Sequence, residues 1–164
     1  MENKKNKILA LKYRPHNFKE LIGQDIMVET ITNSIKLKKL PNAYLLTGIR
    51  GTGKTTTARL IAKAINCKKD FIANKIGEYC DCDSCKEITN DRHLDVLEMD
   101  AASKTGIDDV RELIESSKYN PTSGKYKIYI IDEIHMLSKQ AFNGLLKTLE
   151  EPPPHLKFIF ATTE

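Results

Sequence analysis

Two patterns of apolar residues alternate along this chain. Short runs that are dense in isoleucine, leucine, tyrosine and phenylalanine predict strands that are buried on both faces, as parallel strands are. Between them, apolar residues recur every three or four positions, which is the spacing of one helix face. The runs predict strands over residues 43–47, 95–100, 127–132 and 157–162, and the periodic stretches predict helices over residues 25–38 and 54–65 and around the apolar faces 107–114 and 142–149.

Local signals mark where several of these elements begin and end. Asp108 and Asp109 would lie in the first turn of a helix, where the helix dipole favours negative charge. Ser138 can accept a hydrogen bond at the start of the next helix, and a run of three prolines from Pro152 stops it. Strands that alternate with helices in this way imply an α/β protein with a parallel sheet in a three-layer α/β/α fold.

The turn after the first strand fits the phosphate-binding pattern G-x-x-x-x-G-K-[ST]. Glycines allow backbone conformations that a Cβ would forbid, so successive N–H groups can converge on a phosphate at the start of the next helix. Lys54 is expected to reach the β- and γ-phosphates, and the Thr55 hydroxyl to bind Mg²⁺. A glycine-rich turn without a ligand is the alternative, but the flanking strand and helix favour a nucleotide. The predicted triphosphate ligands are Gly48, Ile49, Arg50, Gly51, Thr52, Gly53, Lys54 and Thr55.

Two carboxylates end the third predicted strand. The carboxyl ends of parallel strands are where an open α/β sheet presents ligand-binding groups. Asp132 is expected to hold the Mg²⁺ shell, and Glu133 to orient or deprotonate a water that attacks the γ-phosphorus. Kinases and GTPases need no glutamate at this point, so the pair favours ATP hydrolysis. Two solvated acids that cap a strand are the alternative interpretation.

Composition limits the class of protein. A chain of 164 residues has room for one domain with one core, and 40% hydrophobic with 29% charged residues is typical of a soluble globular protein. No apolar run approaches the roughly 18 residues of a membrane span. The basic residues 1–7 are not followed by a long apolar stretch, so they do not form a secretory signal and we expect a cytoplasmic protein. The net charge of +4 is compatible with a nucleic-acid partner but too small to argue for one.

Four cysteines lie in one segment, residues 67–89, that interrupts the alternation of strands and helices. In a cytoplasmic protein such a cluster favours a metal site over disulfides. Four thiolates make a closed tetrahedral Zn²⁺ site without an open position, which is structural and not catalytic. Reduced thiols in a surface loop and a redox role are the alternatives, and the Cys-x-Cys spacing is unusual for ligands. The predicted zinc ligands are Cys67, Cys80, Cys82 and Cys85.

Several further motifs occur together with these in a fixed order. They are Tyr13-Arg14-Pro15, Ile22-Gly23-Gln24, Asp100-Ala101-Ala102-Ser103, Asp132-Glu133-Ile134-His135-Met136-Leu137-Ser138 and Leu146-Lys147-Thr148-Leu149-Glu150-Glu151-Pro152-Pro153. In this combination the chain resembles the N-terminal AAA+ module of the gamma/tau subunits of bacterial DNA polymerase III, from about Leu9 to Glu164. The resemblance implies an ATP-driven clamp-loader motor that uses ATP, Mg²⁺ and Zn²⁺.

The resemblance also implies partners. Members of this family work with the other clamp-loader subunits in the cytoplasmic replisome, where they open the sliding clamp and place it on primed DNA. Their contact with the replicative polymerase lies in a C-terminal region, which would follow Glu164. The helical lid and the Ser-Arg-Cys motif, whose arginine acts on a neighbouring subunit's ATP, would follow it too. We therefore expect residues 1–164 to be a truncated AAA+ nucleotide-binding domain with very little turnover of its own and no membrane partner.

Matched by motif, the resemblance assigns further residues. Thr163, at the end of the fourth strand, matches the sensor that reads the γ-phosphate, with its neighbour Thr162 as the alternative. The implied catalytic residues are Lys54, Asp132, Glu133 and Thr163, and the implied adenine contacts are Tyr13, Arg14, Ile22 and Gly23. The family usually spaces its last three cysteines Cys-x-x-Cys-x-x-Cys, and the first of these gaps is one residue shorter here. His135 is interpreted as a structural histidine, because Glu133 already supplies the base.

Other functions are also compatible with parts of the sequence. An AAA+ helicase or initiator would share the nucleotide motifs, but it has no reason to carry the cysteine segment. A scaffold protein that uses the nucleotide site as a switch would need no turnover. A metabolic P-loop kinase would need an acceptor pocket and a phosphate-clamping lid, and the sequence indicates neither.

Overall fold

The computed structural model describes residues 13–69, 80–104 and 106–164. The basic residues 1–7, the start of the resemblance at Leu9 and residues 70–79 of the predicted zinc module lie outside them. The strands are β1 (Ala43–Thr47), β2 (Val96–Asp100), β3 (Lys127–Asp132) and β4 (Leu156–Thr162). They form a sheet in the order β1-β4-β3-β2, and every neighbouring pair is parallel. Because Asp100 pairs with Asp132, and Thr47 with Thr162, the strands end together at one edge of the sheet.

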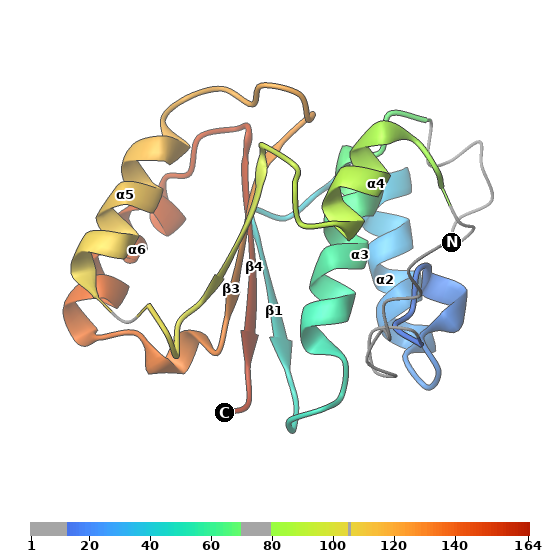
Figure 1. Cartoon of the computed structure of the whole chain (residues 1–164), viewed down its shortest axis with the longest axis horizontal. Coiled ribbons are helices and arrows are strands. Elements are labelled where there is room, and N and C mark those ends of the chain that lie inside the picture. Colours follow the sequence, from blue (N-terminus) through green and yellow to red (C-terminus); the bar gives the residue numbers. More distant parts are fainter. Residues whose placement is uncertain (1–12, 70–79, 105) are drawn as a thin grey trace, which may run out of the picture.

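Helices cover both faces of this sheet, as Figure 1 shows. On one face lie α5 (Ile107–Ser117) and α6 (Lys139–Glu150), and on the other lie α2 (Asp25–Lys36), α3 (Lys54–Asn66) and α4 (Asp83–Thr89). Two short 3₁₀ helices are η1 (Phe18–Glu20) and η2 (Ile134–Met136). The predicted three-layer α/β/α fold with a parallel sheet is confirmed. None of the helices in the described ranges is long and apolar enough to cross a membrane.

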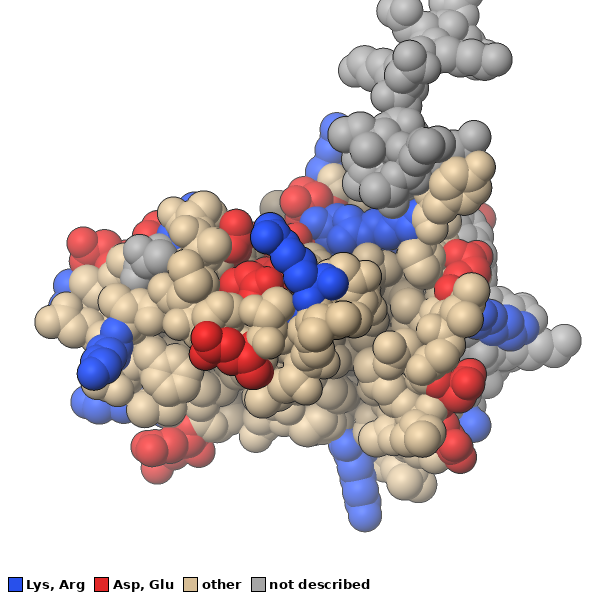
Figure 2. All heavy atoms as spheres, turned by 90° about the horizontal axis from the view of Figure 1, so that it is seen from below, with Lys and Arg blue, Asp and Glu red and all other residues tan. Residues whose placement is uncertain are grey.

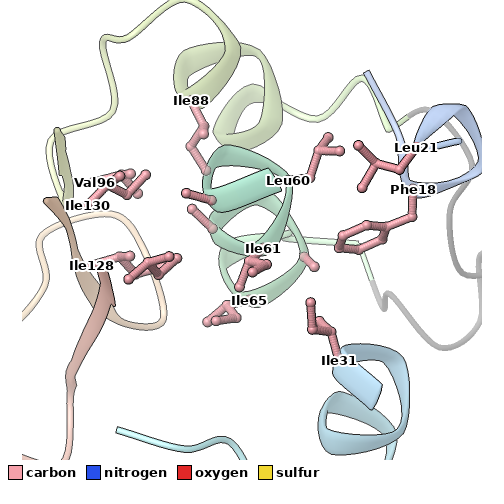
Figure 3. Close-up of a cluster of buried hydrophobic side chains, with 14 residues drawn as sticks. Phe18, Leu21, Ile31, Leu60, Ile61, Ile65, Ile88, Val96, Ile128 and Ile130 are labelled. Carbon is pink, nitrogen blue, oxygen red and sulfur yellow. The ribbon is translucent and has the colours of Figure 1, made fainter. Parts of the chain in front are cut away.

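The middle strands bury side chains on both faces. From β3, Ile128 and Ile130 point toward Ile61 and Ile65 of α3, as Figure 3 shows, whereas Tyr129 belongs to the cluster under α5 and α6. All residues of β4 are buried. Burial on both faces is the reason that these strands have continuous apolar runs instead of an alternating pattern. Each fully buried isoleucine or phenylalanine contributes roughly 1.5–3 kcal/mol to the stability of the fold. The middle of the sheet therefore holds the groups at the carboxyl ends of its strands in fixed positions.

Besides shifts of one residue at the ends of β2, β4 and α3, three features differ from the prediction. The helix predicted to reach Lys38 ends at Lys36, because Lys38 adopts a left-handed conformation with φ 54°. The cysteine segment contains a helix, α4, that the apolar pattern did not indicate. On α6, Phe142 and Leu146 are 40% and 37% exposed, so the predicted core stripe is only partly buried. Phe142 is exposed because it lines an open groove.

Candidate nucleotide site and cysteine cluster

The loop between β1 and α3 bends through glycines with positive φ. They are Gly48 (147°), Gly51 (86°) and Gly53 (83°). A side chain would strain the backbone at each position, so the glycines determine the path of the loop. Gly53 is also the N-cap of α3. The loop therefore leads directly into a helix N-terminus, where free N–H groups and the helix dipole favour an anion.

Lys54 begins α3 and its side chain turns back into the loop. The ammonium donates to the carbonyl oxygens of Gly48 at 2.8 Å and Ile49 at 3.0 Å, and the residue is only 9% exposed. These contacts hold a positive charge within the curve of the loop. Because both acceptors are neutral, they leave the charge of Lys54 uncompensated. The loop thus places a cation next to the N-terminus of α3.

The helix and the sheet meet at one polar contact. The Thr55 hydroxyl donates to Asp132 Oδ2, although 77 positions separate the two residues. Asp132 Oδ1 accepts from the N–H of Glu133 at 3.0 Å, which orients the carboxylate. Oxygen ligands of this kind, together with phosphate oxygens, are those that Mg²⁺ prefers. The chemistry of the pair fits Mg²⁺, and Thr55 and Asp132 are the residues that would hold it.

Glu133 has a left-handed backbone, with φ 51° and ψ 49°, which is uncommon for a residue other than glycine. Its Oε2 accepts from the Thr163 hydroxyl at 3.1 Å, and His135 Nδ1 lies 3.5 Å from the same oxygen. Thr162 is buried, and its hydroxyl lies 2.9 Å from His135 Nδ1. Of the two threonines considered, Thr163 is therefore the one in contact with Glu133. Its role as a sensor stays a prediction.

The clefts that the described residues form at the carboxyl ends of the strands include two that share Lys54. The first, of ≈ 380 Å³, is lined by Arg14, Arg50, Gly51, Gly53, Lys54, Thr55, Thr56, Asp100, Ala102, Asp132 and Glu133. The second, of ≈ 310 Å³, shares Lys54 with the first and is also lined by Gln24, Met27, Leu45, Leu46, Thr47, Gly48, Thr52 and Thr57. Figure 2 views the molecule from this end, and acidic and basic side chains lie side by side near the middle of the face. The first cleft combines the cation and the carboxylates that a magnesium–phosphate ligand requires.

Several lining residues were not predicted from the sequence. Asp100 ends β2 and pairs in register with Asp132, so a carboxylate at the end of the second predicted strand was an available signal. Thr56 lies directly after the phosphate-binding pattern. Gln24 and Met27 reach the second cleft through the packing of α2, for which the sequence gives no local signal.

The residues predicted to contact adenine lie in different surroundings. Arg14 lines the first cleft, and its Nε donates to the Thr56 hydroxyl at 2.9 Å. Burial lowers the pKa of Arg14, and the nearby Arg59 lowers it further. Tyr13 and Ile22 are 73% and 94% exposed, and neither lines the two clefts described above. Gly23 forms a turn with φ 76°. Adenine contact by these residues stays a prediction.

The four cysteines come together beside α3 and α4. The sulfur atoms of Cys67, Cys80, Cys82 and Cys85 all lie within 4.8 Å of one another. Cys67 Sγ is 3.4 Å from Cys80 Sγ and 3.9 Å from Cys82 Sγ. A tetrahedral zinc ion with Zn–S bonds of about 2.3 Å places its sulfur ligands about 3.8 Å apart. The cluster fits Zn²⁺, and the Cys-x-Cys spacing does not separate Cys80 from the other ligands.

The thiols differ in how readily they ionise. Burial raises the pKa of Cys67 to about 11, and it also raises the pKa of Cys85. At Cys82 burial acts in the same direction, but hydrogen bonds from the N–H groups of Cys85 and Lys68 outweigh it and lower the pKa to about 6. The cluster thus offers one ready thiolate beside thiols that need a cation in order to ionise, as metal ligands do.

The loop, the threonine–aspartate pair and the layered parallel sheet together are the features of a P-loop α/β/α fold. The fold is similar to the crystal structure of a DNA polymerase III gamma subunit-related protein from Thermotoga maritima. The TM-score is 0.59 and the identity 23%, over 83% of this chain and 39% of that chain.

Residues 23–164 match the sequence profile of the family described as "DNA polymerase III, delta subunit", and the chain belongs to this family. It is 46% identical over 157 residues to the DNA polymerase III subunit tau of Escherichia coli (strain K12), which covers 96% of this chain and 24% of that protein. It is 50% identical over 159 residues to the subunit gamma/tau of Mycoplasma genitalium, which covers 97% of this chain and 26% of that protein. The resemblance to gamma/tau subunits is confirmed, and the chain spans about a quarter of the length of these relatives.

Proposed function

We propose that this chain is the ATP-binding motor module of a bacterial clamp loader, part of the DNA polymerase III holoenzyme that loads the sliding clamp onto primed DNA during replication. The observation that carries the proposal is the contact between Thr55 and Asp132 beside a glycine loop. It unites a phosphate site and a metal site in a chain that belongs to a DNA polymerase III family.

Each group in the site has a distinct task in ATP hydrolysis. The loop N–H groups and Lys54 bind the β- and γ-phosphates and hold the γ-phosphorus in place. Thr55 and Asp132 would hold Mg²⁺, which would supply positive charge to neutralise the phosphates. Glu133 takes a proton from the attacking water, and Thr163, which contacts Glu133 at 3.1 Å, orients the γ-phosphate.

The partners follow from the same assignment. They are the other clamp-loader subunits, the sliding clamp and, through the assembly, primed DNA, all in the cytoplasm. Contact with the replicative polymerase belongs to a C-terminal region beyond Glu164. Zn²⁺ on the four cysteines is structural, because a closed set of four ligands has no open position for a substrate.

Binding and turnover of Mg·ATP by this chain, beside a version extended through the lid, test the proposal. Binding by both forms with rapid turnover only in the extended one is the expected result, since an arginine supplied from outside the site can be worth about 10³–10⁵ in rate. Lys54→Ala should weaken ATP binding roughly tenfold or more, because it removes a charge-assisted contact. Lys118→Ala is the matched control, since Lys118 pairs with Glu115 on the exposed surface of the molecule. Rapid hydrolysis by the isolated chain would instead indicate a self-contained ATPase.

A further inference from the structure

One histidine side chain lies between the ends of β3 and β4. His135 Nδ1 is 2.9 Å from Thr162 Oγ1 and 3.5 Å from Glu133 Oε2. The same Glu133 oxygen accepts from Thr163. The side chains of His135 and Glu133 are 22% and 25% exposed, so water screens their contact only in part. The imidazole therefore contacts both the Glu133 carboxylate and Thr162, the last residue of β4.

The contacts of His135 determine where its proton lies. An ionised carboxylate only accepts hydrogen bonds, so a bare Nδ1 lone pair at 3.5 Å from Glu133 Oε2 would be repelled. A proton on Nδ1 instead donates to Thr162 Oγ1 and faces the carboxylate favourably. Thr162 Oγ1 also accepts from the N–H of Glu164 at 3.2 Å, which leaves its own hydrogen free to turn elsewhere. These contacts favour the Nδ1–H form of the imidazole.

We propose that His135 is a positioning residue for Glu133. This proposal rests on the proposed function, because Glu133 is the base of the proposed ATP hydrolysis. Because His135 contacts both Thr162 of β4 and the Glu133 carboxylate, it orients the carboxylate relative to β4. Thr163, the next residue, is the group assigned to the γ-phosphate. A displacement of Thr162 at the end of β4 would therefore move His135, and His135 would in turn move the Glu133 carboxylate.

The local backbone does not need the imidazole. The turn after β3 is closed by the N–H of Met136, which donates to the Glu133 carbonyl at 2.8 Å, and by the N–H of Leu137, which donates to Ile134 at 3.1 Å. Both are backbone bonds that any residue at position 135 can keep. A change at His135 is therefore expected to move the carboxylate and to leave the turn in place.

The proton position is tested first, without nucleotide, by ¹⁵N–¹H spectroscopy of the histidine rings at about pH 8, where an ordinary histidine is neutral. His135 is expected in the Nδ1–H form, and His135→Asn identifies its signals. His93 is an internal reference for the opposite form, because its Nδ1 accepts from the N–H of Asp95 at 3.1 Å. In Glu133→Gln the preference of His135 should weaken. An Nε2–H form of His135 in the unmodified chain would overturn the proposal.

Single-turnover hydrolysis with excess protein, measured on the version extended through the lid, tests the consequence. His135→Phe keeps a ring but no donor, and should slow hydrolysis about tenfold while the Kd for Mg·ATP stays within about twofold, since a misdirected base affects the chemical step. His135→Asn places an amide N–H where Nδ1 lies and should restore most of the rate. In a Glu133→Gln background, His135→Phe should add little further loss.

The outcomes separate this proposal from the proposed function. If the unmodified chain does not bind Mg·ATP, the proposed function fails, whatever the proton position of His135. If it binds and His135→Phe hydrolyses at the unmodified rate, the positioning role fails and the nucleotide site stands. An equal loss with and without Glu133 also overturns the positioning role. Thermal unfolding of each variant shows whether a slower rate reflects a damaged fold.

Discussion

At the residue scale, Thr55 and Asp132 show how the fold brings two distant parts of the chain into contact. Neither oxygen alone would hold a divalent cation firmly, and the contact between them brings the start of α3 to the end of β3. The hydroxyl donates to the carboxylate in this structure, and Mg²⁺ would take both oxygens in place of that hydrogen. The pair is therefore the place to test whether the proposed nucleotide binding requires a metal.

Two substitutions of Thr55 test this requirement. Thr55→Val keeps the shape of the side chain but removes the oxygen, and should weaken Mg·ATP binding about tenfold or more, by analogy with the loss of a metal-supporting group. Thr55→Ser keeps the oxygen and should bind nearly as the unmodified chain does. Binding without Mg²⁺ should be similar in all three proteins. A fluorescent ATP analogue titrated with Mg²⁺ and with EDTA gives both values, and an equal loss in EDTA would argue against a metal role.

At the element scale, a buried polar network joins β2, α4 and the loop before β3. Asp95 is 1% exposed and accepts from the N–H groups of Thr122 at 2.7 Å, Ser123 at 2.6 Å and Gly124 at 2.7 Å. Burial acts to raise the pKa of Asp95, but these hydrogen bonds outweigh it and lower the pKa. The carboxylate therefore stabilises the fold above its ordinary pKa and loses that effect as the pH falls below it.

His93 completes this network and is buried at 3% exposure. Its Nδ1 accepts from the N–H of Asp95, so Nε2 carries the proton and donates to the Ser84 hydroxyl at 3.0 Å. Ser84 in turn donates to the Asn66 carbonyl at 2.9 Å. Although serine, histidine and aspartate meet here, the histidine has no free lone pair with which to activate the serine. The network therefore has a structural role, and it holds β2, α4 and the loop before β3 together.

This buried polar network should make the free energy of unfolding depend on pH. Burial lowers the pKa of His93 in the folded chain. Below about pH 6.5 the imidazole is therefore protonated in the unfolded chain but stays neutral in the folded chain. The free energy of unfolding should therefore fall from about pH 6.5 downward, by up to about 1.4 kcal/mol per pH unit, and this group should have little effect above pH 7. Urea unfolding at pH 7.5 and 5.5 measures the fall. His93→Gln keeps a donor toward Ser84 but cannot titrate, and equal slopes in both proteins would exclude His93 as the cause.

The cysteine cluster is the second link that holds α4. Chelation of zinc should lower the unfolding temperature of the chain as isolated, because a structural zinc site contributes its binding energy to folding. Cys80→Ser tests the unusual spacing directly, and should reduce the zinc content below about one ion per chain if Cys80 is a ligand. Ser84→Ala, within the same segment, leaves all four sulfurs in place and should keep the metal. Metal analysis after gel filtration gives the result, and full zinc occupancy in Cys80→Ser would remove Cys80 from the ligand set.

At the scale of the whole molecule, the sequence predicted the parts better than their arrangement. β1 and β3 have their predicted bounds, because each is an apolar run that ends at a glycine loop or at a pair of acids. The order of strands and the contact of Arg14 with Thr56 depend on packing between distant segments, which no local pattern encodes. The motif identified Asp132 and Glu133, and the resemblance assigned Thr163, but the contacts of Thr163 and His135 with Glu133 come from the fold alone. For α4, one cysteine and Ile88 gave too little apolar periodicity to predict a helix.

One lateral edge of the sheet, formed by β1, is open to contact with another molecule. β1 is an edge strand, and no described strand pairs with its outer side. Leu45, in the middle of β1, is 62% exposed and lines an apolar groove of ≈ 580 Å³ together with Phe142 and Phe160. An exposed edge beside an apolar groove favours association between copies of a chain.

We therefore expect the chain as isolated to associate with itself as its concentration rises. Leu45→Lys should weaken that association roughly tenfold or more, because a charge on an edge strand opposes pairing and is costly to bury. Leu94→Lys is the matched control, since Leu94 is 68% exposed but precedes β2, away from the groove. Sedimentation over a concentration series should show Leu45→Lys near the monomer mass of 18.6 kDa, whereas Leu94→Lys follows the unmodified chain. If both lysine variants dissociate equally, the added charge and not the β1 edge explains the effect.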